Sequence, residues 1–244
     1  MDVWLIDLGR AGASERLTTD PAREFDPAWV LDGTEIVFNS NRLEGGVTYS
    51  LFRRPADRSG DDRSLLSAGV TMSAPDWSPV HRLLMYTAAG NLWTIPVRDD
   101  PEPELFLGTP FTEHDGTFSP DGRWVAYVSN ETGRQQVYVR PFPERDPPYP
   151  VSLNGGRAPR WRGDGKEIFF LSPNGTIMAA AIERGRAGVP VPLVETDLVG
   201  VGVGAFPYAV TRDGQRFLVP VALTPPGGTP ITVVLNWPAM LRDR

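Results

Sequence analysis

Residues 118–143, FSPDGRWVAYVSNETGRQQVYVRPFP, contain the pattern that decides the fold. Within it, Ser119–Gly122 is a turn sequence, because proline presets φ, aspartate hydrogen-bonds the backbone that follows it, and glycine accepts a positive φ. The β-branched, aromatic and small residues 124–128 predict a strand, and residues 136–140 predict another that stops before two prolines. The stretch therefore reads as strand, tight turn, strand, looser turn and strand.

The same pattern occurs five times along the chain. Its key positions are spaced by 48, 41, 43 and 49 residues, at Trp29, Trp77, Phe118, Trp161 and Val210. A period of about 40–50 residues is typical of one four-stranded blade of a β-propeller. We therefore expect an all-β propeller of four-stranded antiparallel blades, with five blades, or six as the alternative. The recurring tryptophans are expected to pack in the core.

The repeats predict a single domain over residues 1–244. The expected blades cover residues 24–68, 72–108, 113–153, 157–195 and 206–237, with additional amino-terminal strands within residues 2–19. The last blade lacks an outer strand, so we expect residues 2–8 or 15–19 to pair with residues 231–237 and close the ring. A homodimer formed through the incomplete blade is the alternative to closure within one chain.

Composition excludes several classes of function. A net charge of −6 and an isoelectric point near 5.0 argue against a nucleic-acid partner, because phosphate binding needs a basic face. The chain has no cysteine, which excludes disulfides and cysteine metal sites but does not fix the compartment. No apolar run approaches the roughly 20 residues of a membrane helix, and the start of the chain lacks the layout of a signal peptide.

The repeated turn, most complete at Ser119–Gly122, resembles the TolB-like propeller repeat, a relative of WD-type propellers. Residues 155–182, 211–222 and 230–241 are similar to the carboxyl-terminal propeller of bacterial membrane-spanning serine/threonine kinases. That resemblance implies a sensor or protein-binding platform with no catalytic motif of its own, and an extracytoplasmic location if the chain derives from such a kinase. Because the sequence contains neither kinase motifs nor a membrane helix, we expect a detached or truncated propeller.

In a propeller, the loop that enters each innermost strand brings residues to the central tunnel. The polar residues at these entry positions are Glu24 with Asp26, and Glu113 with His114 and Asp115. Carboxylates with an imidazole suit a divalent cation such as Ca²⁺, Mn²⁺ or Zn²⁺, which would polarise an ester or phosphoryl oxygen and acidify a water. We expect these five residues to hold the metal and residues 113–115 to be catalytic. The alternative is that the acidic residues are solvated or cap turns.

Other entry positions supply four candidate binding residues, Phe25, Ser73, Arg157 and Phe206. The arginine would either clamp an anionic group or pair with Asp115. The phenylalanines would line an apolar tunnel mouth that suits a peptide or a hydrophobic ester. The pair Gly155-Gly156 lacks the following helix of a nucleotide loop, so we interpret it as a flexible entry to a strand.

Two hypotheses about function remain. The first is a ligand- or protein-binding TolB-like module that takes a small molecule, a peptide or a protein partner at the tunnel. The second is a small metal-dependent hydrolase of esters, lactones or phosphotriesters, by architectural analogy with paraoxonase-type propellers, whose motifs are not visible in this sequence. The metal content of the protein and the chelator sensitivity of ester turnover separate the two hypotheses.

Overall fold

The computed structural model of the 244-residue chain describes residues 2–7, 13–144, 146–198, 207–220 and 231–234. Regular structure in these ranges is β-strand, apart from two short 3-10 turns at Leu31–Gly33 and Glu44–Gly46. The strands form two compact units, Met1–Thr109 and Pro110–Arg244. No helix in the described ranges is long and apolar enough to cross a membrane.

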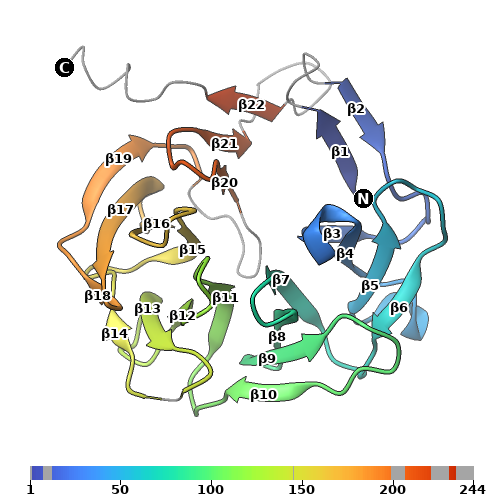
Figure 1. The fold of residues 1–244 in the computed structure, drawn as a ribbon, viewed down its shortest axis with the longest axis horizontal. Coiled ribbons are helices and arrows are strands. Elements are labelled where there is room, and N and C mark those ends of the chain that lie inside the picture. The colour runs from blue at the N-terminus through green and yellow to red at the C-terminus, as the bar shows by residue number, and fades with distance from the viewer. Residues whose placement is uncertain (1, 8–12, 145, 199–206, 221–230, 235–244) are drawn as a thin grey trace. The chain divides into compact units, whose positions relative to one another are not determined.

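The amino-terminal unit contains two four-stranded antiparallel sheets and one strand pair (Figure 1). The first sheet is ordered β3 (Glu24–Val30), β4 (Glu35–Ser40), β5 (Ser50–Pro55) and β6 (Arg63–Leu66). The second is ordered β7 (Met72–Ser78), β8 (Leu83–Ala88), β9 (Asn91–Pro96) and β10 (Glu104–Leu107). The pair consists of β1 (Trp4–Asp7) and β2 (Ala13–Arg16).

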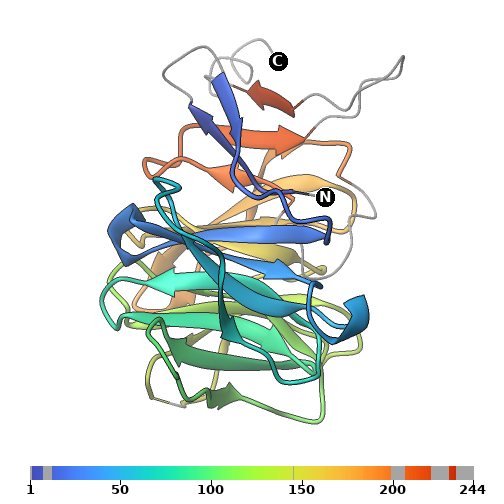
Figure 2. The same cartoon turned by 90° about the vertical axis from the view of Figure 1, so that its right-hand side faces the viewer.

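The carboxyl-terminal unit contains three sheets, whose green, yellow and orange strands can also be followed in Figure 2. The first is ordered β11 (Glu113–Phe118), β12 (Trp124–Ser129), β13 (Gln136–Pro141) and β14 (Tyr149–Pro150). The second runs β15 (Arg157–Trp161), β16 (Glu167–Leu171) and β17 (Thr176–Glu183), which pairs with both β18 (Arg186–Ala187) and β19 (Val191–Glu195). The third runs β20 (Ala209–Val210), β21 (Phe217–Pro220) and β22 (Ile231–Val234).

These sheets confirm the prediction of an all-β propeller built from four-stranded antiparallel blades. The four predicted blades between residues 24 and 195 each correspond to one sheet, and the fifth appears as three strands in the described ranges. The number of blades, the closure of the ring by an amino-terminal strand and the single domain remain predictions.

The predicted turn chemistry is present between β11 and β12. The Ser119 hydroxyl donates to Asp121 Oδ1 at 2.6 Å and accepts the Trp124 amide at 3.0 Å, while Gly122 takes φ +73°. The same arrangement recurs before β21, where Thr211 replaces the serine and accepts the Arg216 amide at 3.1 Å. Each turn therefore satisfies its own backbone and allows the strand that follows to begin at a fixed place.

Each of the four complete blades carries a β-bulge at the same place in its innermost strand. On β11 the register passes from His114↔Val128 to Thr117↔Ala126, so three steps along one strand oppose two along its partner. The strands β3, β7 and β15 show the same one-residue excess. The bulge residue takes a positive φ of 48° at Asp26, 54° at Asp115 and 50° at Ala158. A bulge of this kind redirects the side chains beside it.

Hydrophobic cores lie between neighbouring sheets within each unit. In the amino-terminal unit, Val37 and Leu51 pack with residues of β8 and β9, while Phe38 on the opposite face of β4 packs with Val3 and Leu17. In the carboxyl-terminal unit, β12, β13, β16 and β17 share one cluster, and β16, β17, β20 and β21 share the next. The strands are therefore buried on both faces, as blades of a propeller require.

The tryptophans at the blade period differ in burial. Trp77 and Trp161 are partly buried and pack against cores, and the Trp161 indole donates to the Thr117 carbonyl at 3.2 Å. Trp29 is 55% exposed, so the prediction that it packs in the core is wrong. The physical reason is its place at the start of the repeats: within its unit only the short pair β1–β2 precedes this blade in the chain.

Candidate functional site

The bulge in β11 places three polar residues at the entry of this innermost strand. Glu113, His114 and Asp115 are only 1%, 3% and 2% exposed. Aspartate is among the few residues that accept a positive φ readily, which explains its presence at the bulge. All three belong to the carboxyl-terminal unit and are buried, and a side-chain contact is seen between His114 and Asp115.

His114 has a polar neighbour at each ring nitrogen. Its Nδ1 lies 3.2 Å from Asp115 Oδ1, and its Nε2 lies 3.3 Å from Nε2 of Gln135. A neutral imidazole with its proton on Nδ1 suits both contacts, because Nε2 then accepts from the amide and Nδ1 faces the carboxylate. Neither Nδ1 nor Oδ1 makes a hydrogen bond of good geometry with a described group.

Asp115 also connects the two inner strands β11 and β15. Its Oδ2 accepts the amide of Ala158, the bulge residue of β15, at 3.2 Å. The carbonyl of Ala158 in turn accepts the hydroxyl of Tyr208 at 2.9 Å. Burial raises the pKa of this tyrosine far above its usual value, so its hydroxyl remains a donor at any physiological pH. The cluster thus ties three blades of the unit together.

Arg157 stands at the entry of β15, one residue before the bulge. Its guanidinium donates to the Leu198 carbonyl at 2.7 Å. Burial lowers the pKa of Arg157, while the negative charge of Asp115 acts in the opposite direction. Arg157 is thus half-buried and influenced by the charge of Asp115, and both expectations for it, an anion clamp or a pair with Asp115, remain predictions.

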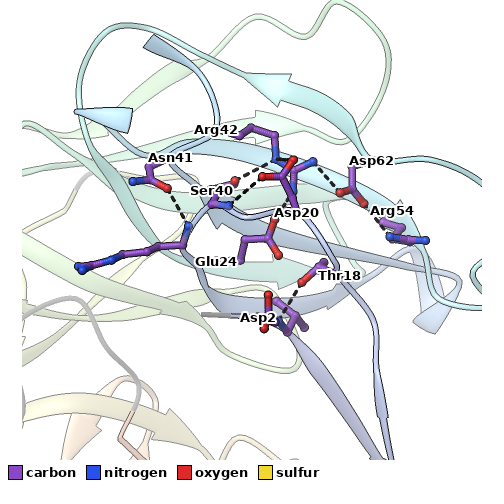
Figure 3. A network of polar contacts seen from close by, with 12 residues as sticks. Asp2, Thr18, Asp20, Glu24, Ser40, Asn41, Arg42, Arg54 and Asp62 are labelled. Carbon is purple, nitrogen blue, oxygen red and sulfur yellow. Dashed lines mark hydrogen bonds and ion pairs between the residues drawn. The ribbon is translucent and has the colours of Figure 1, made fainter. Parts of the chain in front are cut away.

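In the amino-terminal unit, the buried Glu24 belongs to a network of charged side chains (Figure 3). Arg42 forms an ion pair with Glu24, another with Asp62 at 2.6 Å, and donates to Ser40 Oγ at 3.0 Å. Asp62 also accepts from Arg54 at 3.2 Å. Burial raises the pKa of Glu24, and this effect exceeds the opposing hydrogen bond from Thr18 and the attraction of Arg42.

The remaining predicted site residues lie as follows. Asp26 is the bulge residue of β3. Phe25 packs edge-on against Tyr49, with 4.7 Å between the ring centres. Ser73 lies opposite Thr87 in the β7–β8 pair. Phe206 lies outside the described residues. Among the described side chains, no group of three or more His, Asp or Glu is arranged to hold a metal ion. The expected metal site draws on both units, so it remains a prediction.

A groove of about 660 Å³ lies in the carboxyl-terminal unit, beside the β14–β15 loop. The loop residues Leu153–Gly155, the turn Ser172–Asn174 and residues of β17 and β19 form its walls, with Phe170 and Met178 among them. Leu153 is 60% exposed and Val189 80%, so apolar side chains of the groove are open to solvent. The volume falls within the range of about 300–1,000 Å³ that is usual for ligand pockets.

The walls of the groove are held by hydrogen bonds and close packing. Gln136 accepts the Gly155 amide at 2.9 Å and donates to the Leu153 carbonyl at 3.3 Å. Gly155 takes φ +93°, and a Cβ on it would stand 2.7 Å from Cγ of Pro173. The pair Gly155-Gly156 is therefore a close-packed corner, and our interpretation of it as a flexible entry is corrected by this packing.

Sequence reasoning found some of these residues and missed others. The glycine pair Gly155-Gly156 was singled out because glycine marks special backbone positions, although its interpretation as flexible was wrong. Arg42, Gln135 and Tyr208 carried none, since their partners are distant in sequence. The apolar side chains of the groove also look like ordinary strand residues, and only the three-dimensional arrangement leaves them exposed.

Comparison with known proteins found similarity in structure alone. No protein-family model matches the sequence, and no curated protein matches it either. Among solved structures, TolB from Acinetobacter baumannii superposes with a TM-score of 0.67 at 17% identity, over 87% of this chain and 52% of TolB. The present chain thus spans about half of that TolB chain.

Two enzymes with propellers are also similar. An oligogalacturonate lyase in complex with manganese gives a TM-score of 0.62 at 13% identity, over 90% of this chain and 68% of the lyase. A puromycin-hydrolysing peptidase of Mycobacterium tuberculosis gives 0.60 at 17% identity, over 82% of this chain and 34% of the peptidase. These levels of identity establish the fold and leave the activity open. The chain therefore has the fold of a TolB-like β-propeller.

Proposed function

We propose that the chain is a non-catalytic binding module that takes a small molecule, a peptide or a protein partner, and that it acts as a sensor domain. The observation that carries this proposal is the groove of about 660 Å³ in the carboxyl-terminal unit. It combines open apolar side chains with walls fixed by hydrogen bonds, which is the composition expected of a preformed ligand site. Little ordering is needed before a ligand binds, because Gln136 already holds the loop.

The state of the acidic residues also supports binding over hydrolysis. Glu24 is engaged by Arg42, and Asp115 by the Ala158 amide and His114. With exposed fractions of 3% or less, His114 and Asp115 do not reach a substrate in the surrounding solvent without rearrangement. These contacts explain the residues as buried structural links between strands, which differs from the alternative drawn from the sequence, that they are solvated or cap turns.

The proposal is tested by a thermal-shift screen of small molecules and short peptides. A ligand at 100 times its dissociation constant adds about 2.7 kcal/mol to the free energy of unfolding, which shifts the melting temperature by several degrees. The shift should be lost in Leu153→Asp, which charges the groove, and kept in Val47→Asp, which alters an exposed valine in the other unit. Shifts that persist unchanged in Leu153→Asp would exclude the groove as the binding site.

A metal-dependent hydrolase of esters, lactones or phosphotriesters is the second proposal. It is favoured by the His114 Nδ1–Asp115 Oδ1 contact of 3.2 Å, a pairing that can position an imidazole for proton transfer. The lyase of similar fold was solved with manganese, so this architecture accommodates a metal in at least one protein. The purified protein should then contain stoichiometric metal, and its turnover of chromogenic esters should vanish with chelator and in His114→Ala. Absence of metal and of turnover would rule this proposal out.

A further inference from the structure

We infer that the groove binds a peptide segment in which an apolar side chain is followed by lysine or arginine; this inference rests on the proposed binding function. The two ends of the groove differ in chemistry. Its apolar end is built from Leu153, Phe170, Met178 and Val189. Its other end continues into a polar hollow of about 530 Å³, which shares residues Asn174, Thr176 and Glu195 with the groove.

The polar end carries negative charge without a matching cation in its lining. Glu195 and Asp197 line the hollow together with Asn174, Thr176 and Thr196, and no lysine, arginine or histidine is among the described residues that line either hollow. Both carboxylates are exposed, so they attract a cation without having to be desolvated first. An occupant with an ammonium or guanidinium group at this end complements the charge.

The spacing between the two ends is fixed by the fold. Thr196 donates its hydroxyl to the Gly175 carbonyl at 2.6 Å, and its amide lies 3.1 Å from the same oxygen. The Ser172 hydroxyl accepts the Thr176 amide at 3.0 Å, which holds the neighbouring turn. The acidic end therefore cannot move independently of β17 and the turn before it, and the groove presents one apolar position and one acidic position at a constant separation.

The outer strand of this blade also indicates how the peptide is recognised. β19 is bordered and interrupted by Pro190 and Pro192, which have no amide hydrogen to donate. Proline on an edge strand disfavours the addition of another strand. The peptide is therefore held by its side chains, with an apolar group against Met178 and a basic group near Glu195 and Asp197. The long stem of lysine or arginine suits this junction, because it covers apolar surface while its charge stays in water.

The inference is tested by fluorescence anisotropy with three labelled hexapeptides. The first is acetyl-Gly-Leu-Phe-Lys-Arg-Gly; the second replaces both basic residues by glutamate, and the third replaces both apolar residues by serine. The first peptide should bind the full chain more tightly than the other two, and its affinity should fall as salt rises. The double variant Glu195→Gln/Asp197→Asn should weaken it about 2- to 25-fold, as expected for two exposed ion pairs.

Two control variants make the result specific. Glu183→Gln removes an exposed carboxylate from the opposite end of β17, and Val47→Asn changes an exposed valine in the other unit; neither should alter the affinity. Leu153→Asn should weaken binding about fivefold or more through lost apolar contact. If the glutamate peptide binds equally well, or the double variant has no effect while Leu153→Asn does, the groove binds ligands but the inferred occupant is wrong. If no peptide binds the wild type, the inference is overturned and the thermal-shift screen alone decides the binding function.

Discussion

Substitution of Arg42 by methionine should be among the most destabilising single changes at a charged residue of the amino-terminal unit. Arg42 is 15% exposed in its side chain, and its partner Glu24 is 0% exposed. Its guanidinium also lies 4.5 Å from the centre of the Phe52 ring. Removing the guanidinium leaves the Glu24 carboxylate without a counter-charge. One of its oxygens already lacks a hydrogen-bond partner among the described groups. Asp62 keeps Arg54 as a partner, so Glu24 bears most of the loss.

The magnitude follows from this burial. Breaking a buried ion pair by removing one partner costs about 3–5 kcal/mol, because the remaining charge is uncompensated. At about 2–4 °C per kcal/mol for a chain of this size, Arg42→Met should lower the melting temperature by about 6–20 °C. The matched control is Arg58→Met, which breaks an exposed pair with Glu15 at 2.6 Å and should cost less than about 1 kcal/mol.

The assay is thermal and urea unfolding followed by circular dichroism. The double variant Glu24→Gln/Arg42→Met also removes the unpaired negative charge. Its free energy of unfolding should be at least about 2 kcal/mol higher than that of Arg42→Met. A cost below about 1 kcal/mol for Arg42→Met, or a double variant no more stable than the single one, would refute the reasoning that Glu24 is buried as an anion and depends on Arg42.

Three further predictions follow. Because burial raises the pKa of Glu24, the folded protein keeps the carboxyl proton to a higher pH than the unfolded chain does, and the associated stability is lost as pH rises through the raised pKa. The melting temperature of the wild type relative to Glu24→Gln should therefore fall from about pH 4 upward. A difference in melting temperature that stays constant with pH would contradict this prediction. Gly155→Ala meets Pro173 and a positive φ, so it should cost about 1–3 kcal/mol in urea unfolding, whereas Gly188→Ala, with its nearest atoms at 3.7 Å, should be tolerated. Tyr208→Phe leaves the Ala158 carbonyl without this donor and should cost about 1 kcal/mol by the same measurement; a neutral result would mean that another donor replaces it.

The fold was predictable because its determinants are local and repeated. Ser119, Asp121 and Gly122 form a turn from neighbouring residues alone, and the blade period then places the strands. The bulges were not predicted, although the entry positions were correctly aligned, because an extra residue on one strand is defined only against its partner. The exposure of Trp29 was missed for a similar reason, since burial depends on which sheet lies opposite.

The candidate site was predictable only in part. The sequence singled out Glu113, His114 and Asp115 as consecutive residues, and the structure shows all three buried with His114 beside Asp115. It gave no sign that Glu24 would pair with Arg42, which is 18 positions away, or that Tyr208 would reach Ala158, 50 positions away. The packing of the blades determines which polar residues distant in sequence pair with each other, and no local sequence pattern indicates these pairs.

The repeated bulge also changes how positions in these inner strands should be chosen for mutagenesis. A regular strand alternates its side chains between two faces, so odd and even positions can be treated as two separate classes. One additional residue at Asp26, Asp115 or Ala158 shifts that alternation, and positions before the bulge share a face with positions of the opposite parity after it. A library that follows simple alternation from Phe118 back to Glu113 would assign the positions before the bulge to the wrong face of this buried strand. Residues before and after the bulge must instead be assigned to the two faces of the strand separately, starting the alternation anew at the bulge residue.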